Sequence, residues 1–271
     1  MNSFSLEFLK EILSNEYSND YVYNILEGYN TNRKTTIRVN TLISTFEEVI
    51  QFLDKNNISY SAVSDIQNAI IINDSYDVTK TKLYENGAIY LQSLSSMLPS
   101  LILNPKEDAH ILDMCAAPGS KTTQLAALTN NKACITACEF DKIRAERLTF
   151  NLNKMGANRV TVLVKDSRNL DEFFRFDTIL LDAPCSGSGA VLLKCQKRQI
   201  SLLKKGLSIL NKNGILVYST CSILKEENEE VLNACLNNNF ELVAIDKDQY
   251  DLPYLPSLEN TMTITPTDLY E

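Results

Sequence analysis

The stretch Asp113–Thr122 reads Asp-Met-Cys-Ala-Ala-Pro-Gly-Ser-Lys-Thr and lies between a short apolar run and a segment with helical periodicity. Small residues at such a junction let the backbone approach a ligand, and the N–H groups at the helix start point toward it. The stretch is not a Walker A loop, because Gly119 and Lys121 are not adjacent and no glycine lies five residues before Gly119, and it lacks the GxGxxG pattern. We interpret it as a loop that binds the nucleoside part of a cofactor.

Around this loop, short apolar runs alternate with segments long enough for crossover helices. The runs that we expect to be strands are Ile111–Met114, Ala133–Glu139, Val160–Lys165, Thr178–Asp182, Ile215–Ser219 and Glu241–Ile245. Two intervening helices are indicated by the apolar stripes Leu148, Leu152, Met155 and Ile200, Leu203, Leu207, Leu210, with Gly156 and Gly214 at the expected C-caps. The pattern predicts a Rossmann-like, doubly wound α/β fold with a mostly parallel sheet.

The first part of the chain has a different pattern. It shows helical periodicity at Leu6–Leu13 and Phe46–Leu53, and short strands are expected at Thr36–Asn40 and Ala69–Ile72. We therefore expect a small N-terminal α/β module over residues 1–85 and a larger domain over residues 86–271. The boundary rests on the change of pattern alone, because no Pro-rich or Gly/Ser-rich linker marks it.

Composition limits the class of protein. The 271 residues carry a net charge of −8 with a pI near 4.9, which argues weakly against a large nucleic-acid footprint. Two basic clusters could each line a groove or form an ordinary solvated face: Arg33, Lys34, Arg38 and Lys194, Lys197, Arg198, Lys204, Lys205. The acidic run Glu226, Glu227, Glu229, Glu230 is interpreted as a solvated helix start.

Three features that are missing from the sequence constrain where in the cell we expect the protein. No stretch approaches the ~20 apolar residues that span a bilayer, the N-terminus lacks the pattern of a signal peptide, and the seven cysteines form no dense disulfide framework. We expect a cytoplasmic protein without membrane contact.

Two cysteines lie at the ends of expected strands. The fourth strand ends in Asp182-Ala183-Pro184-Cys185-Ser186-Gly187, and the fifth ends in Tyr218-Ser219-Thr220-Cys221-Ser222. The carboxyl edge of a doubly wound sheet is the ligand crevice, so we expect Asp182, Cys185 and Cys221 to converge there with the cofactor loop. The chain has one histidine, His110, so a reactive cysteine needs other activation; a helix capped by Ser222 or a neighbour would favour a thiolate at Cys221.

The remaining cysteines are interpreted as packing residues, because cysteine is among the most buried residue types. They are Cys115, Cys134, Cys138, Cys195 and Cys235. Cys134 and Cys138 are expected on one face of a buried strand. No CxxC pair is present, and we expect no metal site.

Acidic residues complete the expected cofactor site. Glu139 ends the second strand about 20 residues after Gly119, where doubly wound folds place the carboxylate that binds ribose hydroxyls. Asp166 follows the third strand and could meet the adenine.

These motifs, in this order, resemble the Fmu/Sun-type (NOL/NOP/Sun family) RNA cytosine-5 methyltransferases, whose hallmarks are a DxCAAPGxKT loop, a DAPCSG strand end and a TCS turn. The resemblance begins near Arg38 and includes the stretches Arg38–Thr41, Gly87–Ser96 with Gln92 and Ser95, and Glu226–Glu229. It implies S-adenosylmethionine as cofactor, ribosomal or transfer RNA as substrate, no metal, and a monomer. It also makes residues 1–85 an RNA-binding type of module and residues 86–271 the catalytic domain.

The resemblance also implies roles for single residues. Cys221 becomes the nucleophile, Cys185 assists breakdown of the adduct, Asp182 contacts the cytosine ring, and Lys121 joins them as a catalytic residue. The expected cofactor-binding residues are Cys115, Ala116, Ala117, Pro118, Gly119, Lys121, Glu139, Arg144, Asp166 and Asp182. Residues Ala190–Cys195 replace the Arg- and Pro-containing stretch of the family, so target-loop contacts do not transfer. Family chains continue past a segment like Thr261–Glu271, so we expect the chain to be truncated at Glu271.

Cytosine methylation explains why two cysteines are needed. Carbon 5 is too poor a nucleophile to attack a sulfonium methyl, so a thiolate must first add at carbon 6. The carbon 5 proton must then leave and the thiolate must be expelled, which a second cysteine can assist. Asp182, if protonated or sharing a proton with ring N3, would stabilise the developing charge. The base must be unstacked, so a single-stranded, looped or flipped cytosine is expected.

Three alternative functions have less support. An amino-methyltransferase shares the fold but usually ends its fourth strand in an NPPY-like turn, where this chain has Cys185. A non-catalytic RNA-binding protein is disfavoured by the presence of Asp182, Cys185 and Cys221 together. A nicotinamide oxidoreductase lacks support because the glycine fingerprint is missing.

Overall fold

The computed structural model describes residues 3–73, 75–186 and 192–270, with side chains from Leu9 and, after the second gap, from Lys194. The chain forms two compact units. The first, which we call the sheet unit, comprises Lys34–Asp182 and Lys205–Tyr218. The second, the cysteine unit, comprises Met1–Arg33, Ala183–Lys204 and Ser219–Glu271.

A five-stranded sheet in the order β7-β6-β5-β8-β9 forms the centre of the sheet unit. Its strands are β5 (His110–Asp113), β6 (Cys134–Glu139), β7 (Val160–Val164), β8 (Phe176–Asp182) and β9 (Leu210–Ser219). β5 pairs in parallel with both β6 and β8, and β6 pairs in parallel with β7. The predicted doubly wound α/β fold is confirmed, because helices connect the parallel neighbours β5, β6 and β7 of one sheet.

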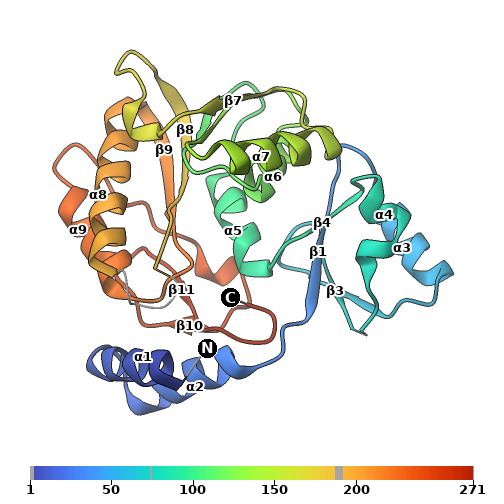
Figure 1. Cartoon of the computed structure of the whole chain (residues 1–271), viewed down its shortest axis with the longest axis horizontal. Coiled ribbons are helices and arrows are strands. Elements are labelled where there is room, and N and C mark those ends of the chain that lie inside the picture. The colour runs from blue at the N-terminus through green and yellow to red at the C-terminus, as the bar shows by residue number, and fades with distance from the viewer. Residues whose placement is uncertain (1–2, 74, 187–191, 271) are drawn as a thin grey trace. The chain divides into compact units, whose positions relative to one another are not determined.

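Helices pack on this sheet through apolar stripes. They are α5 (Leu94–Leu103), α6 (Ser120–Leu128) and α7 (Lys142–Lys154). α7 contacts β6, β7 and α6, as Figure 1 shows. Leu148 and Leu152 of α7 are buried in the core, as the periodicity predicts. α7 ends where Gly156 takes a φ of +70°, so the predicted C-cap glycine is confirmed.

The C-terminal end of the expected pattern differs from the structure. Residues 241–245 form no strand, and Val243 is exposed. The reason is that an apolar run makes a strand only where a neighbouring strand takes up its backbone hydrogen bonds. Gly214 lies inside β9 rather than at a helix C-cap. The reason is that α8 (Leu192–Ile209) continues directly into β9 at Leu210, without a capping turn.

A smaller antiparallel sheet, in the order β2-β3-β1-β4, lies in the same unit. Its strands are β1 (Thr35–Val39), β2 (Tyr60–Ala62), β3 (Ala69–Ile72) and β4 (Ile89–Leu91). Helix α3 (Phe46–Lys55) begins with a capping box between Thr45 and Glu48. It buries Val49 and Leu53 in the apolar core of this sheet. The short η1 (Val78–Lys80) and α4 (Lys82–Glu85) precede β4. β1, β3 and α3 confirm the expected elements, whereas β2 and β4 were missed because they are only three residues long. This sheet continues past residue 85, and the division into residues 1–85 and 86–271 stays a prediction.

Arg38 is a buried structural residue, so both alternatives given for it, a groove and a solvated face, are wrong. Its side chain is 2% exposed; Nε donates to Gln92 Oε1 at 2.8 Å and Nη2 donates to Thr123 Oγ1 at 2.9 Å. Burial lowers the pKa of Arg38 to about 10. Asn40 makes a similar link, donating to the carbonyl oxygens of Gly87 at 2.8 Å and Met155 at 2.9 Å. These contacts join the small sheet to α6 and to the end of α7, because β1 carries Arg38 and Asn40 directly follows it.

The cysteine unit contains α1 (Ser3–Glu16), α2 (Asn19–Asn30), most of α8, η3 (Lys225–Glu227), α9 (Glu229–Cys235), η4 (Lys247–Gln249), β10 (Tyr254–Leu255) and β11 (Thr263–Ile264). α1 and α2 contact each other (Figure 1). Leu13, Ile25 and Leu255 pack in one apolar cluster there. Arg33 donates to the carbonyl oxygens of Thr267 and Tyr270, so it caps C-terminal backbone groups instead of facing a groove. Within the described part of the chain, no helix combines the length and apolarity needed to cross a membrane.

Candidate active site

The cofactor loop is fastened at both ends to Asp113, the last residue of β5. One carboxylate oxygen of Asp113 accepts from Thr122 Oγ1 at 2.7 Å, and the other accepts from the Cys115 N–H at 3.4 Å. Gly119 precedes α6 with a φ of +109°, a conformation that L side chains rarely adopt. The pKa of the buried Asp113 is raised to about 6, chiefly by desolvation. The loop therefore has a single defined path between strand and helix.

Four carboxylates lie along the carboxyl edge of the parallel strands. Asp113, Glu139 and Asp182 end β5, β6 and β8, and Asp166 follows the end of β7 by two residues. These strands are neighbours in the order β7-β6-β5-β8, so their ends meet at one edge. Three of the four have a basic partner, namely Lys121 for Asp182, Arg144 for Glu139 and Arg168 for Asp166, so the edge offers oriented hydrogen-bond acceptors rather than free negative charge. The sequence predicted Glu139, Asp166 and Asp182 at strand ends, and the structure places all three along this edge.

Glu139 is held between the cofactor loop and the start of α7. It is 3% exposed, its Oε1 accepts from the Asp141 N–H at 3.0 Å, and its Oε2 lies 3.4 Å from Arg144 Nη1. Arg144 also donates to the carbonyl oxygen of Ala117 at 2.9 Å. Three residues expected around the cofactor thus form one connected group.

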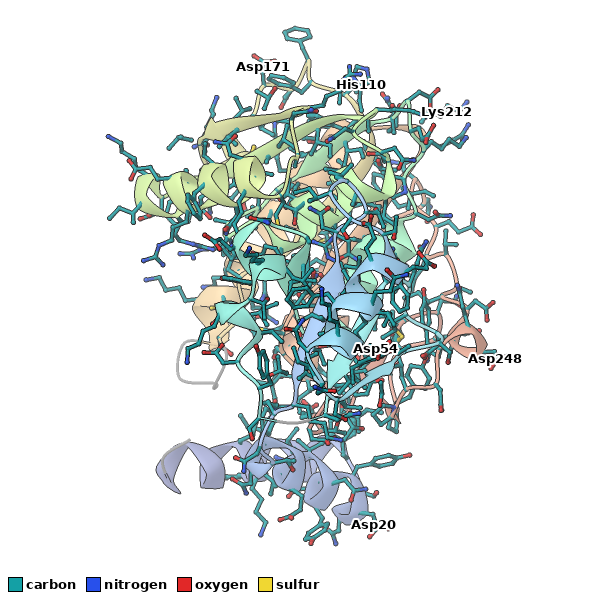
Figure 2. All side chains as sticks on the ribbon, turned by 90° about the vertical axis from the view of Figure 1, so that its right-hand side faces the viewer. Asp20, Asp54, His110, Asp171, Lys212 and Asp248 are labelled. Carbon is teal, nitrogen blue, oxygen red and sulfur yellow. A yellow bond between two sulfur atoms is a disulfide. The ribbon has the colours of Figure 1, made fainter. Side chains whose placement is uncertain are left out.

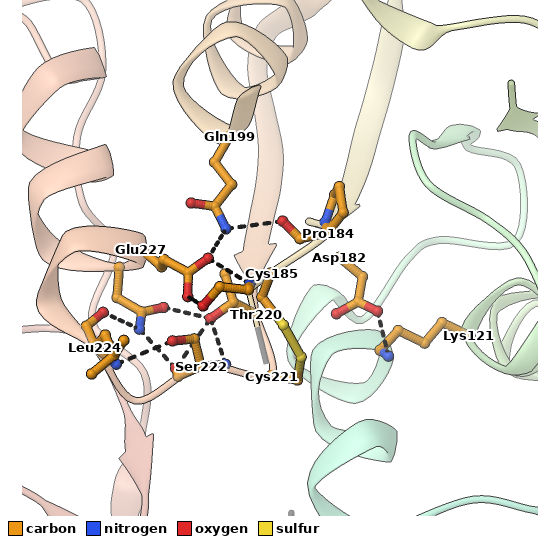
Figure 3. The surroundings of a disulfide bond; sticks show 12 residues. Lys121, Asp182, Pro184, Cys185, Gln199, Thr220, Cys221, Ser222, Leu224 and Glu227 are labelled. Atoms are coloured by element: carbon orange, nitrogen blue, oxygen red, sulfur yellow. Dashed lines mark hydrogen bonds and ion pairs between the residues drawn. A yellow bond between two sulfur atoms is a disulfide. The ribbon is translucent and has the colours of Figure 1, made fainter. Parts of the chain in front are cut away.

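Lys121 and Asp182 form an ion pair, drawn in Figure 3. Lys121 Nζ lies 2.7 Å from Asp182 Oδ2 and donates to Ser96 Oγ at 3.0 Å. The two charged residues were expected to be catalytic, but Ser96 was missed, although it lies in the stretch Gly87–Ser96 that carries part of the family resemblance. The pair holds the Asp182 carboxylate at the end of β8.

Asp166 and Cys115, both expected to bind the cofactor, differ in charge. Asp166 accepts from Arg168 Nε at 3.0 Å, an ion pair that the sequence did not predict. Burial, with nearby carboxylates, raises the pKa of the Cys115 thiol. Cys115 is therefore a neutral packing residue of the loop rather than a thiolate.

Cys185 and Cys221 are adjacent in the cysteine unit, and their sulfurs form a disulfide of 2.03 Å (Figure 3). Their Cα atoms are 6.3 Å apart although 36 positions separate them in the chain. The expectation that these two cysteines meet is confirmed. A free Cys221 thiolate is not present in this structure, so the oxidised pair must be reduced before either sulfur can act as a nucleophile. Gly187, which ends the motif, lies outside the described residues, as do Ala190 and Val191 of the stretch Ala190–Cys195, whose remaining residues begin α8.

The expected helix directly after Cys221 is wrong. Ser222 Oγ accepts from the Leu224 N–H at 3.2 Å in an irregular turn, and only the three-residue η3 follows. The α-helix of this segment, α9, begins at Glu229. Helix-dipole effects fall off within one turn, so α9 is too far along the chain to stabilise a thiolate at Cys221.

Glu227 corrects the interpretation of the acidic run as a solvated face. Its side chain is fully buried, and it accepts from the Ser186 N–H and Ser186 Oγ, each at 2.8 Å. Gln199 Nε2 donates to Glu227 Oε1 at 3.1 Å. A buried carboxylate with three donors is a structural anchor, which no local pattern distinguishes from an exposed glutamate.

The other cysteines confirm the packing interpretation in part. Cys138 and Cys235 are buried, whereas Cys134 is exposed because it is the first residue of β6. His110 begins β5 at the opposite edge of the sheet from Asp113, and its N–H donates to Asp177 Oδ2 at 2.9 Å (Figure 2 labels it). Among the described residues, no group of three His, Cys, Asp or Glu side chains could hold a metal ion.

The basic cluster on α8 stays a prediction. Lys194, Lys197 and Lys204 are exposed, and Arg198 is partly exposed. Their helical spacing places them on one face of α8. These four residues lie in the cysteine unit, whereas Lys205 belongs to the sheet unit.

A parallel sheet with carboxylates at the ends of its strands and a small-residue loop before its first crossover helix is the architecture of Rossmann-like methyltransferase domains. The chain belongs to the family described as 16S rRNA methyltransferase RsmB/F, which matches residues 100–268. The ferredoxin-like domain of RsmF/B-like methyltransferases matches residues 7–79.

Relatives of known name support this assignment. The tRNA (cytosine(49)-C(5))-methyltransferase of Pyrococcus abyssi is 36% identical over 75% of this chain and 70% of its own length. Ribosomal RNA small subunit methyltransferase F of Shewanella loihica is 34% identical over 73% of this chain and 46% of its own length. A crystal structure of a methyltransferase homologue from Pyrococcus horikoshii has a TM-score of 0.78 at 34% identity and covers 94% of this chain and 88% of that one. The chain spans about half or less of the length of the first curated relatives that it matches.

Proposed function

We propose that this protein transfers a methyl group from S-adenosylmethionine to carbon 5 of a cytosine in ribosomal or transfer RNA, in the cytoplasm. The observation that carries the proposal is the contact between the sulfurs of Cys185 and Cys221, which join two separate strand-end motifs. The names of the relatives add support, since they include cytosine-C5 methyltransferases of both RNA classes.

The chemistry of the carboxyl edge fits S-adenosylmethionine. The cofactor offers hydroxyl, amino and ammonium groups as hydrogen-bond donors, and four carboxylates along this edge supply acceptors. We assign Glu139 to the ribose hydroxyls and Asp166 to the adenine, with the backbone of residues 115–119 against the nucleoside. Arg144 orients Glu139 and the loop through its contact with the Ala117 carbonyl. When bound, the cofactor supplies an electrophilic methyl group to carbon 5.

We assign the covalent step to Cys221. In the reduced protein, its thiolate forms a bond to carbon 6 of the cytosine, which gives carbon 5 the enamine character that it needs as a nucleophile. After methylation, the carbon 5 proton leaves to a base, the bond between sulfur and carbon 6 breaks, and the electron pair returns to sulfur. The exposed side chain of Cys221 suits attack on a large substrate, and the partly buried Cys185 suits the later assistance.

Asp182 is assigned to the cytosine ring and Lys121 to the orientation of Asp182. The ammonium group 2.7 Å from Asp182 Oδ2 holds this carboxylate in one place, where it can accept from an amino group or share a proton with ring N3. Preorganised charge of this kind stabilises a transition state without reorganisation during the reaction.

The two cysteine variants test the proposal. Cys221→Ala should abolish both methylation and any covalent complex. Cys185→Ala should still attack and transfer methyl but stall as a protein–RNA adduct that survives denaturing electrophoresis. RNA with 5-fluorocytosine, which cannot lose its fluorine as a proton, should trap the wild-type protein through Cys221.

Cys134→Ala is the matched control, because Cys134 is an exposed thiol at the start of β6, away from the carboxyl edge. It should behave as wild type in every assay. An adduct that forms in Cys221→Ala and vanishes in Cys185→Ala reverses the roles. Turnover unaffected by either substitution would sink covalent cytosine-5 chemistry altogether.

A further inference from the structure

Two irregular segments carry the cysteines. Residues 183–186 and 220–224 belong to no helix or strand, although Ala183 N–H donates to the Ser219 carbonyl and the Leu224 carbonyl accepts from Glu227. Backbone groups of such segments need other partners, so the side chains that bind them decide where they lie. Two consecutive residues, Glu227 and Asn228, supply these partners, one for each segment.

Glu227 holds the segment that contains Cys185. Its two carboxylate oxygens accept from the N–H and the hydroxyl of Ser186, the residue after Cys185, at 2.8 Å each. Gln199 of α8 donates both to Glu227 Oε1 at 3.1 Å and to the carbonyl oxygen of Pro184, the residue before Cys185, at 3.0 Å. Both chain neighbours of Cys185 are therefore tied to one buried carboxylate and its glutamine partner (Figure 3).

Asn228 holds the segment that contains Cys221. Its Oδ1 accepts from Thr220 Oγ1 at 2.8 Å, and its Nδ2 donates to the carbonyl oxygens of Ser222 at 2.8 Å and Leu224 at 2.9 Å. Thr220 and Ser222 are the two chain neighbours of Cys221. The side chain of Asn228 thus uses its acceptor and both of its donors on this turn.

We propose that Glu227 and Asn228 are positioning residues that set the distance and orientation between the two reacting cysteines. Because they are consecutive, one planar peptide unit joins the two residues, and a shift of either backbone is passed directly to the other. Glu227 places Cys185 for breakdown of the adduct, and Asn228 places Cys221 for attack. The inference rests on the proposed function for its kinetic consequences, since a displacement of about 1 Å can cost about a hundredfold in rate.

The roles predict opposite effects of two neighbouring substitutions. Asn228→Ala should slow formation of the adduct with 5-fluorocytosine RNA by about tenfold or more, with little effect on adduct breakdown. Glu227→Ala should leave adduct formation within about threefold of wild type but make adducts accumulate on ordinary cytosine RNA in the presence of S-adenosylmethionine. Glu227→Gln keeps one oxygen acceptor and should fall between wild type and Glu227→Ala, which guards against a variant that fails to fold.

Glu230→Ala is the matched control. Glu230 is an exposed glutamate of the same segment and accepts from Gln196 Nε2 of α8 at 2.7 Å, much as Glu227 accepts from Gln199. It touches neither cysteine segment in any of these contacts and should behave as wild type.

A second measurement does not depend on RNA. In the reduced protein, each substitution should change the rate at which iodoacetamide alkylates one cysteine. Glu227→Gln should change the rate at Cys185, and Asn228→Ala should change the rate at Cys221. Equal changes at both cysteines, or kinetics of both variants that match Glu230→Ala, would overturn the positioning roles. A wild-type protein that forms no adduct would instead overturn the proposed function, while the selective alkylation would still support the placement of the cysteines.

Discussion

Lys121 Nζ and Asp182 Oδ2 lie 2.7 Å apart, and the Lys121 side chain is 13% exposed. α6 supplies the ammonium group and β8 supplies the carboxylate, so the first turn after the cofactor loop holds the residue that we assign to the cytosine. Asp182 is 33% exposed, so the pair is partly buried and is screened less by solvent and salt than a fully exposed ion pair.

Lys121→Met should therefore reduce methyl transfer by about ten- to a hundredfold, because Asp182 loses the group that orients it. Incorporation of labelled methyl into RNA measures this. Lys132→Met is the control: Lys132 lies at the same 2.7 Å from Glu107, but both side chains are well exposed. Equal losses of methyl transfer in the two variants would show that Lys121 does not orient Asp182 for the reaction.

Glu139→Gln should weaken binding of S-adenosylmethionine and S-adenosylhomocysteine by about tenfold, since a charge-assisted hydrogen bond to the ribose is replaced by a neutral one. Isothermal titration calorimetry on the reduced protein measures the affinity. Glu146→Gln, on an exposed position of α7, should bind as wild type does. Binding of NAD without heat from either sulfur-containing ligand contradicts the cofactor assignment.

Asp113 should make stability depend on pH. Its pKa in the folded protein is about 6, above its ordinary value of 3.8. Asp113 therefore contributes fully to the free energy of unfolding below about pH 4, and this contribution is lost as pH rises through about 6. The loss amounts to about 2–3 kcal/mol in order of magnitude. In Asp113→Asn this dependence should vanish, so the melting temperature of the variant minus that of wild type should rise between pH 4.5 and 7.5. A constant difference across that range argues that Asp113 does not titrate there.

Reduction should control the covalent step. The wild-type protein, with Cys185 and Cys221 joined, should form no adduct with 5-fluorocytosine RNA until a dithiol reductant opens the disulfide. Cys185→Ala has no partner sulfur for Cys221 and should form the adduct with or without reductant. Adduct formation by the fully oxidised wild-type protein would exclude Cys221 as the nucleophile.

The basic face of α8 should contribute to RNA affinity. Charge reversal at Lys197, Arg198 and Lys204 should weaken binding and flatten the plot of log affinity against log salt, by up to about one in slope for each phosphate that the variant no longer neutralises. Fluorescence anisotropy with labelled RNA at several salt concentrations measures this slope. If the slope stays the same, the cluster is an ordinary solvated face.

Local signals predicted much of the fold. The ends of β3 and the C-cap at Gly156 follow from the sequence, because strand composition and a left-handed glycine are properties of neighbouring residues. The apolar runs of the chain predict the buried parallel strands for the same reason. The failure at residues 241–245 has the converse reason: a pattern typical of a strand does not supply a partner strand.

The sequence by itself determined which residues we assign to the chemistry: the loop Asp113–Thr122, the carboxylates at the strand ends, and the two cysteines, Cys185 and Cys221. Only the tertiary structure decided which glutamate of an acidic run is buried, that Arg38 is an internal link, and that Glu227 and Asn228 hold the two cysteine segments. The physical reason is that burial and hydrogen-bond partners depend on residues far apart in the chain. Ser186 and Glu227, separated by 41 positions, meet at 2.8 Å, and no local pattern encodes that contact.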